Sequence, residues 1–348
     1  MTVAPYLAVA MQLPARSVEA APDVPAARKA ILAHIRELEA ELAGTRDFLE
    51  KFSGTPMKLA VLPEYLFTGF PTGRVPDFRA RAVFAPDGPE YGLLGEVAKR
   101  LGLFIAGNAY ESDPHFPTLH FQASFLLAPS GEVVLRYRRL NSMFTASPHD
   151  VWSAYTRHYG PDAIFPVADT EIGRIGAIAS EEILYPEIAR AHALRGAELF
   201  IHSSSESGGL LPSGKQIARR ARALENLAWV VSANTAGIEM SDIAGQSADG
   251  NSAIIDWRGT VVAEALSGRN INAFAEIDIE AVRRARRKPG MSNYLARQRL
   301  ELFRDTYAGV VQPADSLLED GEVKAKTPGD TVRILRDIIA RRAREGLI

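Results

Sequence analysis

Cysteine is absent from this 348-residue chain. The absence excludes a disulfide framework, a thiolate metal site and a thiol nucleophile. No apolar run approaches the roughly 18 residues that a membrane-spanning helix needs. The first 14 residues lack a basic region before their apolar stretch, so we expect a first strand there and not a signal peptide. These absences favour a cytoplasmic protein with no membrane partner.

An excess of charge of one sign is also missing. The chain has 40 basic and 42 acidic residues, for a formal net charge of −2, so we expect no nucleic-acid partner. Arginine-rich clusters at 219–222 and 283–287 are expected to be solvated faces or interface pairs. Because the chain has no glycine-rich phosphate loop and no metal-ligand spacing, we expect neither a cofactor nor a metal.

Short apolar strands alternate with helical patterns along most of the chain. Hairpin turns are predicted at 129–131 and at 258–259, each between two apolar runs. The helices are predicted at 24–52, 91–101, 215–226, 279–288 and 330–346. No linker precedes residue 312, so the pattern predicts one α/β domain over 1–311 and a C-terminal arm over 312–348 that ends in a charged amphipathic helix.

One stretch combines a strand, a sharp turn and a helix. A buried strand is predicted over 175–179, and Ser180 follows at the junction with a helix that runs through Arg195. A side chain at such a junction lies at the mouth of a sheet beside backbone N–H groups, which suits a nucleophile that generates an oxyanion. The alternative is that Ser180 only caps the helix, and the local pattern by itself favours the cap.

Four segments in order carry a resemblance to a known family. They read LPE, RYRRL, IGAIASEEILYPE and RGAEL, at 62–64, 136–140, 175–187 and 195–199, and Ser203-Ser204 follows the last. Over about 5–310 the chain resembles the nitrilase superfamily of carbon–nitrogen hydrolases. The resemblance implies a four-layer α-β-β-α sandwich, a small-molecule amide, nitrile or carboxylate as ligand, and a homodimer or higher homo-oligomer assembled through helices.

The resemblance also implies a catalytic set with two replacements. The family's glutamate, lysine and cysteine positions correspond to Glu64, Arg139 and Ser180. A further family glutamate has no clear counterpart, and Asp150 is the nearest candidate. In the family mechanism the glutamate takes the thiol proton, the thiolate attacks, and the lysine stabilises the resulting anion.

The two replacements change the expected chemistry. A thiol has a pKa of about 8.5, whereas a serine hydroxyl needs a base acting in the same step, and a carboxylate with a reference pKa of about 4.3 is a weak base for that. Arg139 keeps a positive charge but cannot exchange protons, and it could clamp Glu64 bidentately. We therefore favour a binding protein with little or no classical hydrolysis.

Two alternatives stay open. In the first, Ser180 is an active nucleophile, Glu64 is its base, and Arg139 binds the oxyanion or a substrate carboxylate. In the second, the chain is an engineered cysteine-to-serine form of an active amidase, which would leave Arg139 unexplained.

The remaining candidate residues surround the predicted pocket. Asp150 and Tyr155, in the segment 138–162, and Ser203 and Ser204, at the end of the next strand, are expected to contact the substrate. Glu181 is a further candidate, although both Glu181 and Glu182 are expected chiefly to complement a helix dipole. Ser203-Ser204-Ser205 with Lys215 could indicate a serine–lysine amidase, but the glycine-rich context is missing, so a pocket wall is expected.

Overall fold

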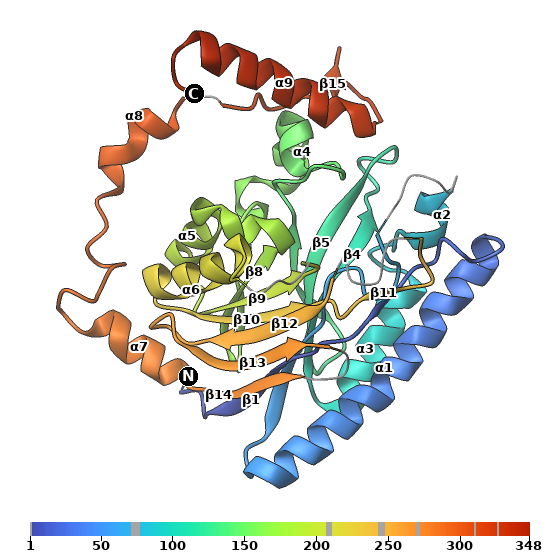
Figure 1. Cartoon of the computed structure of the whole chain (residues 1–348), viewed down its shortest axis with the longest axis vertical. Coiled ribbons are helices and arrows are strands. Elements are labelled where there is room, and N and C mark those ends of the chain that lie inside the picture. The colour runs from blue at the N-terminus through green and yellow to red at the C-terminus, as the bar shows by residue number, and fades with distance from the viewer. Residues whose placement is uncertain are drawn as a thin grey trace.

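Two six-stranded sheets lie face to face, and helices cover their outer faces (Figure 1). The structure, a computed structural model, describes residues 2–70, 77–206, 211–242, 248–268, 272–309, 311–325 and 327–348. The arrangement is the α-β-β-α sandwich that the sequence predicts. Within the described residues, no helix combines the length and apolar character needed to cross a membrane.

The first sheet has the strand order β14-β1-β3-β4-β5-β6. Its strands are β1 (Tyr6–Ala10), β3 (Met57–Val61), β4 (Phe104–Ser112), β5 (His120–Leu127), β6 (Val133–Arg138) and β14 (Ala273–Ile277). β1, β3 and β4 are parallel, and β5 and β6 form the hairpin predicted at 129–131. Parallel strands end at the same edge of a sheet, and Glu64 follows β3 at that edge.

The second sheet has the order β13-β12-β10-β9-β8-β7. Its strands are β7 (Ala168–Thr170), β8 (Gly173–Ala179), β9 (Leu199–Ser204), β10 (Trp229–Asn234), β12 (Gly250–Ile255) and β13 (Val261–Ser267). β8, β9 and β10 are parallel, and β12 and β13 form the hairpin predicted at 258–259. Ser180 follows β8, and Ser203-Ser204 closes β9, so both lie at one edge.

The helices include five that lie close to the predicted ranges 24–52, 91–101, 215–226, 279–288 and 330–346. In chain order the helices are α1 (Val24–Ser53), α2 (Phe78–Ala82), α3 (Pro89–Leu101), α4 (Trp152–Tyr159), α5 (Pro186–Leu194), α6 (Gly214–Asn226), α7 (Ile279–Arg287), α8 (Arg304–Tyr307) and α9 (Pro328–Arg344). The side chain of Asp23 caps α1 by accepting a hydrogen bond from Ala26 N–H at 2.8 Å. Gly54, in the left-handed region at φ 73°, ends that helix.

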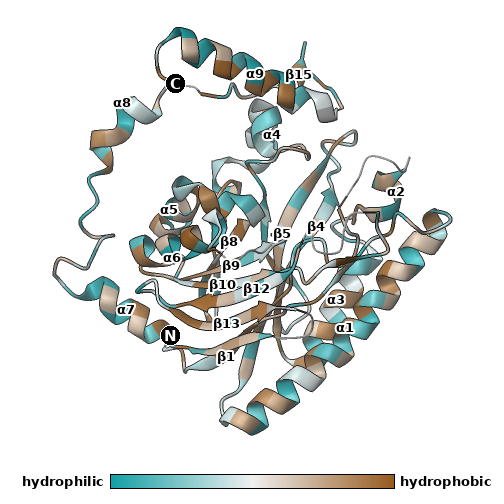
Figure 2. Cartoon of the chain, in the orientation of Figure 1, coloured by the Kyte–Doolittle hydropathy of each residue, from teal (hydrophilic) through white to brown (hydrophobic). Residues whose placement is uncertain are grey.

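Side chains alternate along each strand, so a strand contributes to the core on both faces of its sheet. On β1, Leu7 and Val9 pack with α1 and α3, whereas Tyr6, Ala8 and Ala10 pack between the two sheets. In Figure 2 the strands are predominantly apolar and the outer helices carry polar stripes. Glu64, Arg139 and Ser180 each follow the end of a strand.

Beyond α7 the chain runs along the outside of the sandwich and returns over α4 (Figure 1). The returning segment includes two short strands, β15 (Leu318–Glu319) and β16 (Glu322–Val323). Leu317 is buried in a cluster with Tyr155, and Ser316 Oγ donates a hydrogen bond to Asp150 Oδ1 at 2.7 Å. The arm therefore docks on the α4 region, while its independence from 1–311 as a domain stays a prediction.

Candidate active site

Ser180 occupies a tight elbow at the end of β8. Its φ of 49° lies in the left-handed region, where a residue with a side chain is strained by about 1–3 kcal/mol. A short 3-10 turn, Ser180–Leu184, follows, and Ala179 precedes it at the capping position. The predicted continuous helix after the junction is wrong. Pro186 cannot continue the turn and its ring holds the residue before it in an extended conformation, so α5 begins only there.

His202 on β9 contacts the backbone of the elbow. Its Nε2 lies 2.9 Å from the carbonyl oxygen of Ser180, and its Nδ1 lies 2.7 Å from Ser232 Oγ. A carbonyl oxygen only accepts hydrogen bonds, so Nε2 carries the ring proton and Nδ1 accepts from the hydroxyl. Burial, with a contribution from the positive charge of Arg219, lowers the pKa of His202 to about 3. The imidazole is therefore a neutral support and not a general base.

This lowered pKa predicts an acid-sensitive contribution to stability. Below pH 6.5 the unfolded chain binds a proton at His202 that the folded chain does not bind, so stability is lost as the pH falls from 6.5 towards 3. We expect His202→Gln to be less stable than the wild type at pH 7.5 by about 1–3 kcal/mol. Between pH 6.5 and 4 the free energy of unfolding in urea should fall with decreasing pH in both proteins. The slope for the variant should be smaller than the wild-type slope by up to about 1.4 kcal/mol per pH unit. An unchanged slope would contradict a neutral buried His202.

Glu64 is buried at the end of β3, and both of its carboxylate oxygens have partners. Oε1 accepts a hydrogen bond from Gln122 Nε2 at 2.5 Å and lies 3.5 Å from Arg139 Nη1. Oε2 accepts from Ser205 Oγ at 2.7 Å. Gln122 Nε2 also donates to Asn108 Oδ1 at 2.9 Å. These contacts hold the carboxylate in place beside Arg139.

Arg139, at the end of β6, lies between two carboxylates. Its Nη1 donates to Gln122 Oε1 at 2.6 Å and faces Glu64, while its Nη2 pairs with Glu181 Oε1. The side chain is buried, at 7% exposure. The guanidinium is always charged, and two carboxylates balance that charge.

Lys215 reaches the elbow from the first turn of α6. Its Nζ donates to Ser180 Oγ at 3.3 Å and to Ser204 Oγ at 3.4 Å. The sequence associates Lys215 with the serines at 203–205 but not with Ser180. Ser203 points elsewhere, because its hydroxyl donates to the carbonyl oxygen of Leu62 at 2.7 Å.

A cavity of about 410 Å³ joins these groups. Its polar lining comes from seven side chains: Glu64, Tyr65, Arg139, Ser180, Glu181, Ser205 and Lys215. Phe70 and Phe144 add apolar surface. The three residues predicted to be catalytic therefore surround one space, which has the size of a small-molecule site.

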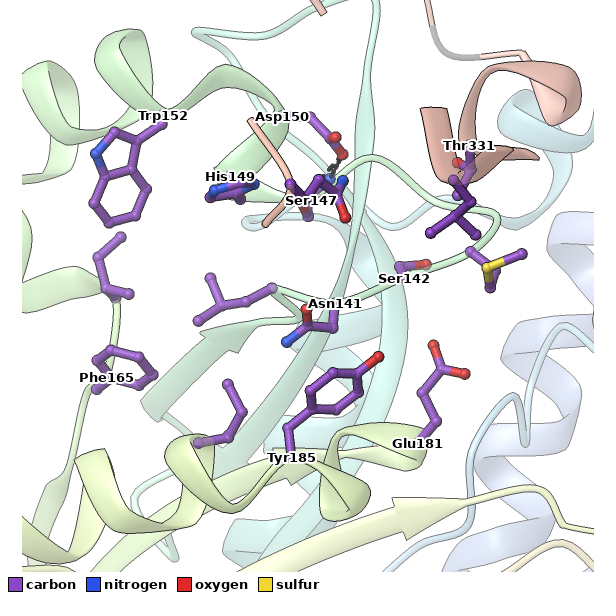
Figure 3. Close-up of a pocket in the computed structure, with 16 residues that line it drawn as sticks. Asn141, Ser142, Ser147, His149, Asp150, Trp152, Phe165, Glu181, Tyr185 and Thr331 are labelled. Carbon is purple, nitrogen blue, oxygen red and sulfur yellow. Dashed lines mark hydrogen bonds between the residues drawn. The ribbon is translucent and has the colours of Figure 1, made fainter. Parts of the chain in front are cut away.

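A second cavity, of about 540 Å³, adjoins the first and shares Met143 and Glu181 with it (Figure 3). Asp150 lines this neighbouring cavity and not the one at Ser180. Its Oδ2 accepts from the backbone N–H and the hydroxyl of Ser147, and its Oδ1 accepts from Ser316. Asp150 thus shapes the loop and holds the arm, unlike the substrate contact that the sequence predicts.

Tyr155 lies in a core and lines neither cavity. It is buried among apolar side chains that include Phe116 and Phe121. The guanidinium of Arg138 lies 5.6 Å from the centre of its ring, which is cation–π distance. The expected substrate contact at Tyr155 is therefore replaced by packing beneath α4.

Glu182 has a structural role that the sequence does not reveal. It is fully buried and accepts hydrogen bonds from the backbone N–H groups of Leu140 and Asn141 at 2.7 and 2.9 Å and from Tyr137 OH at 2.8 Å. Burial raises its pKa to about 7. These bonds tie the elbow to the segment that carries Arg139, whereas the expectation for Glu182 was a helix-dipole partner.

The part of the chain that the structure describes contains no candidate metal site. No three histidine, aspartate or glutamate side chains converge there in a way that could hold an ion. Sequence reasoning missed Gln122 at this site. It linked Lys215 to the serine run and not to Ser180.

The facing sheets and the cavity at the elbow define an α-β-β-α sandwich with a candidate small-molecule site. The profile of the carbon–nitrogen hydrolase family matches residues 8–287. This chain belongs to the carbon–nitrogen hydrolase family, which is the nitrilase superfamily that its motifs resemble. The predicted family and fold are thereby confirmed.

Relatives of this chain include amidases. The omega-amidase NIT2-A of Xenopus laevis is 25% identical over 223 residues, which cover 64% of this chain and 77% of that protein. A formamidase of Bacillus cereus is 26% identical over 237 residues, covering 67% of this chain and 63% of that protein.

Solved structures share the fold at low identity. Nit3 of Saccharomyces cerevisiae has a TM-score of 0.62 and 22% identity, covering 81% of this chain and 93% of its own. A carbon–nitrogen hydrolase of Helicobacter pylori has a TM-score of 0.63 and 19% identity, covering 87% and 98%. An amidase of Nesterenkonia sp. has a TM-score of 0.60 and 18% identity, covering 86% and 96%.

Proposed function

We propose that this chain binds a small-molecule amide in the cavity at Ser180 and cleaves its C–N bond with Ser180 as the nucleophile. The observation that carries the proposal is the elbow itself, because Ser180 is held at a strained φ, its hydroxyl faces a cavity, and the side-chain nitrogen of Lys215 lies 3.3 Å away. Strained side-chain-bearing residues of this kind cluster at active sites. The amidase relatives support the choice of an amide as substrate.

In this proposal Ser180 takes the place of the family's cysteine and Arg139 that of its lysine. The serine oxygen attacks the amide carbon, the amine leaves, and water releases the acyl group from Ser180. Arg139 faces the negative charge that develops on the carbonyl oxygen. Glu64 and Gln122 hold the guanidinium in position through the contacts described above.

The choice of ligand has support from one relative. Solved forms of the Nesterenkonia amidase hold butyramide and acrylamide, and another carries the acetamide moiety of fluoroacetamide on its active-site cysteine. A short amide is therefore the first ligand to test. The cavity of about 410 Å³ accommodates molecules of that size.

A second candidate function is binding without turnover. The observation that favours it is the balance of charge around Arg139, which Glu64 and Glu181 already neutralise. With Glu64 and Arg139 engaged in these contacts, the site would bind a small amide or carboxylate and leave it intact. This is the function that the two replacements favour at the level of sequence.

Assembly into a homodimer or higher oligomer stays a prediction. Apolar side chains are exposed on the outer helices of the second sheet, where Leu194 on α5 is 50% exposed and Ile217 on α6 is 61% exposed. Exposed apolar surface of this kind supports an interface between copies of the chain.

The two candidates differ in product formation. We expect the purified protein to release ammonia from at least one amide in a panel of acetamide, butyramide, acrylamide and longer ω-amides. Intact-mass spectrometry should detect an acyl group on Ser180 during turnover. A panel member that raises the unfolding temperature without ammonia release would support binding alone. In that case Ser180→Cys with Arg139→Lys should gain hydrolysis. An absence of both binding and turnover would contradict both candidates.

A further inference from the structure

We propose that Lys215, and not Glu64, is the general base that activates Ser180. The inference rests on the proposed function for its substrate, but it concerns the reactivity of the serine itself. It assigns catalysis to a residue from α6, outside the three positions that the family resemblance implies.

The geometry places the amine of Lys215 against the nucleophile. Nζ lies 3.3 Å from Ser180 Oγ, and its other described contact is Ser204 Oγ at 3.4 Å. Both partners are neutral hydroxyls. Among the described residues, no carboxylate oxygen lies within 4.0 Å of this Nζ, so no ion pair holds the amine away from Ser180. A base must come within hydrogen-bond reach of the proton it removes, about 2.6–3.2 Å between heavy atoms, and such contacts often shorten only when substrate binds. The separation of 3.3 Å fits that requirement.

Charged groups surround the amine on several elements. Glu206, after β9, is the acid that interacts with it over a longer range, and Arg219 on α6 pairs with that acid at 3.4 Å. Glu64, Arg139 and Glu181 line the same cavity. His202 beneath the elbow is neutral because burial lowers its pKa to about 3. These groups set the electrostatic environment in which the pH dependence of the site is measured.

Glu64 has a different set of contacts. Its oxygens accept hydrogen bonds from Gln122 and Ser205 and face Arg139. No hydrogen bond joins Glu64 to Ser180 among the residues that the structure describes. Glu64 is thus placed to position Arg139, while Lys215 is placed to take the serine proton.

The proposed steps balance. The neutral amine of Lys215 takes the proton of Ser180 as Oγ bonds to the amide carbon, and the carbonyl electron pair moves to the oxygen. The tetrahedral species collapses, the C–N bond breaks, and the ammonium of Lys215 gives its proton to the leaving nitrogen. Water then attacks the ester carbon, Lys215 takes a water proton, and Ser180 recovers it as the C–O bond breaks. The net reaction is amide plus water to carboxylic acid plus amine.

An acylation assay tests the base without requiring amide turnover. p-Nitrophenyl acetate is the probe, and the readouts are the rate of p-nitrophenolate release and the acetylated peptide that contains Ser180. We expect Lys215→Met to slow acylation of Ser180 by about 10²–10⁴-fold, the usual contribution of a general base. Lys215→Arg should be as slow, because a guanidinium keeps the charge but cannot take a proton. The matched control is Lys288→Met at the exposed end of α7, which should react at the wild-type rate.

The pH profile separates a base from a structural cation. In the wild type the acylation rate should rise with pH, and in Lys215→Met this rise should disappear. Circular dichroism and thermal unfolding check that the variants are folded. Glu64→Gln should slow acylation far less than Lys215→Met and keep the rising profile.

Three results would overturn the assignment. They are an unreactive Ser180 in the wild type, wild-type acylation in Lys215→Arg, and a rising profile that is lost in Glu64→Gln but kept in Lys215→Met. If acylation depends on Lys215 but the protein hydrolyses no amide, the assignment of Lys215 as general base stands. That result would refute only the proposed function.

Discussion

Ser180→Ala should abolish amide turnover while leaving ligand binding largely intact. We expect kcat to fall by about 10⁴-fold or more, because removal of a nucleophilic serine leaves only the contributions of binding and electrostatics. The dissociation constant of butyramide should change by less than about tenfold, since the change removes one hydroxyl from a cavity with several other polar groups. Ammonia release measures the first quantity and calorimetry the second.

Ser130→Ala is the matched control for this prediction. Ser130 lies in the turn between β5 and β6, far along the chain from the elbow and outside the cavity lining. Its variant should turn over at the wild-type rate. Residual activity of Ser180→Ala within tenfold of the wild type would remove the hydroxyl from the mechanism.

Arg138→Met should destabilise the protein by about 3–5 kcal/mol, the usual effect of breaking a buried ion pair from one side. Arg138 is 6% exposed and pairs with Glu111 at 3.1 Å and with Asp113. The side chains of both acids are fully buried. Arg136 remains beside Glu111 at 2.6 Å, but Asp113 loses its guanidinium partner. The packing of the guanidinium on the Tyr155 ring is lost as well. Urea unfolding of the variant and the wild type measures the difference.

An exposed ion pair provides the comparison. Arg284 on α7 pairs with Asp278 at 2.9 Å, and the two side chains are 67% and 38% exposed. Arg284→Met should therefore change the free energy of unfolding by less than about 1 kcal/mol. Equal losses for the two variants would show that burial does not set the strength of the Arg138 network.

Local signals in the sequence predicted many of the helices, strands and turns, whereas the sandwich was implied by the family resemblance. The Asp23 cap, the turns at 129–131 and 258–259, and the apolar runs between them each act over a few residues, so they can be read without the fold. The interrupted helix after Ser180 also has a local cause. Pro186 restricts the residue before it to an extended conformation, and this restriction predicts the break that a continuous helix does not allow.

Candidate residues within the segment 138–162 were harder to place. Asp150 and Tyr155 have the side chains of substrate contacts, but one caps a loop and docks the arm, and the other packs on Arg138. Whether such a side chain faces a cavity or a core depends on which distant segment covers it. Here the covering segment is the arm that contains Ser316 and Leu317.

The amino-acid sequence by itself determined the family, the layered architecture and the chemical types at Glu64, Arg139 and Ser180. It could do so because strand periodicity, turn residues and motif spacing are properties of short segments. Tertiary structure alone decided that Lys215 contacts Ser180, that Glu64 and Glu181 both neutralise Arg139, and that Gln122 joins them. The physical reason is that hydrogen bonds and ion pairs act over a few ångströms, and only the packing of two sheets brings residues from β3, β5, β6, β8 and α6 within that range.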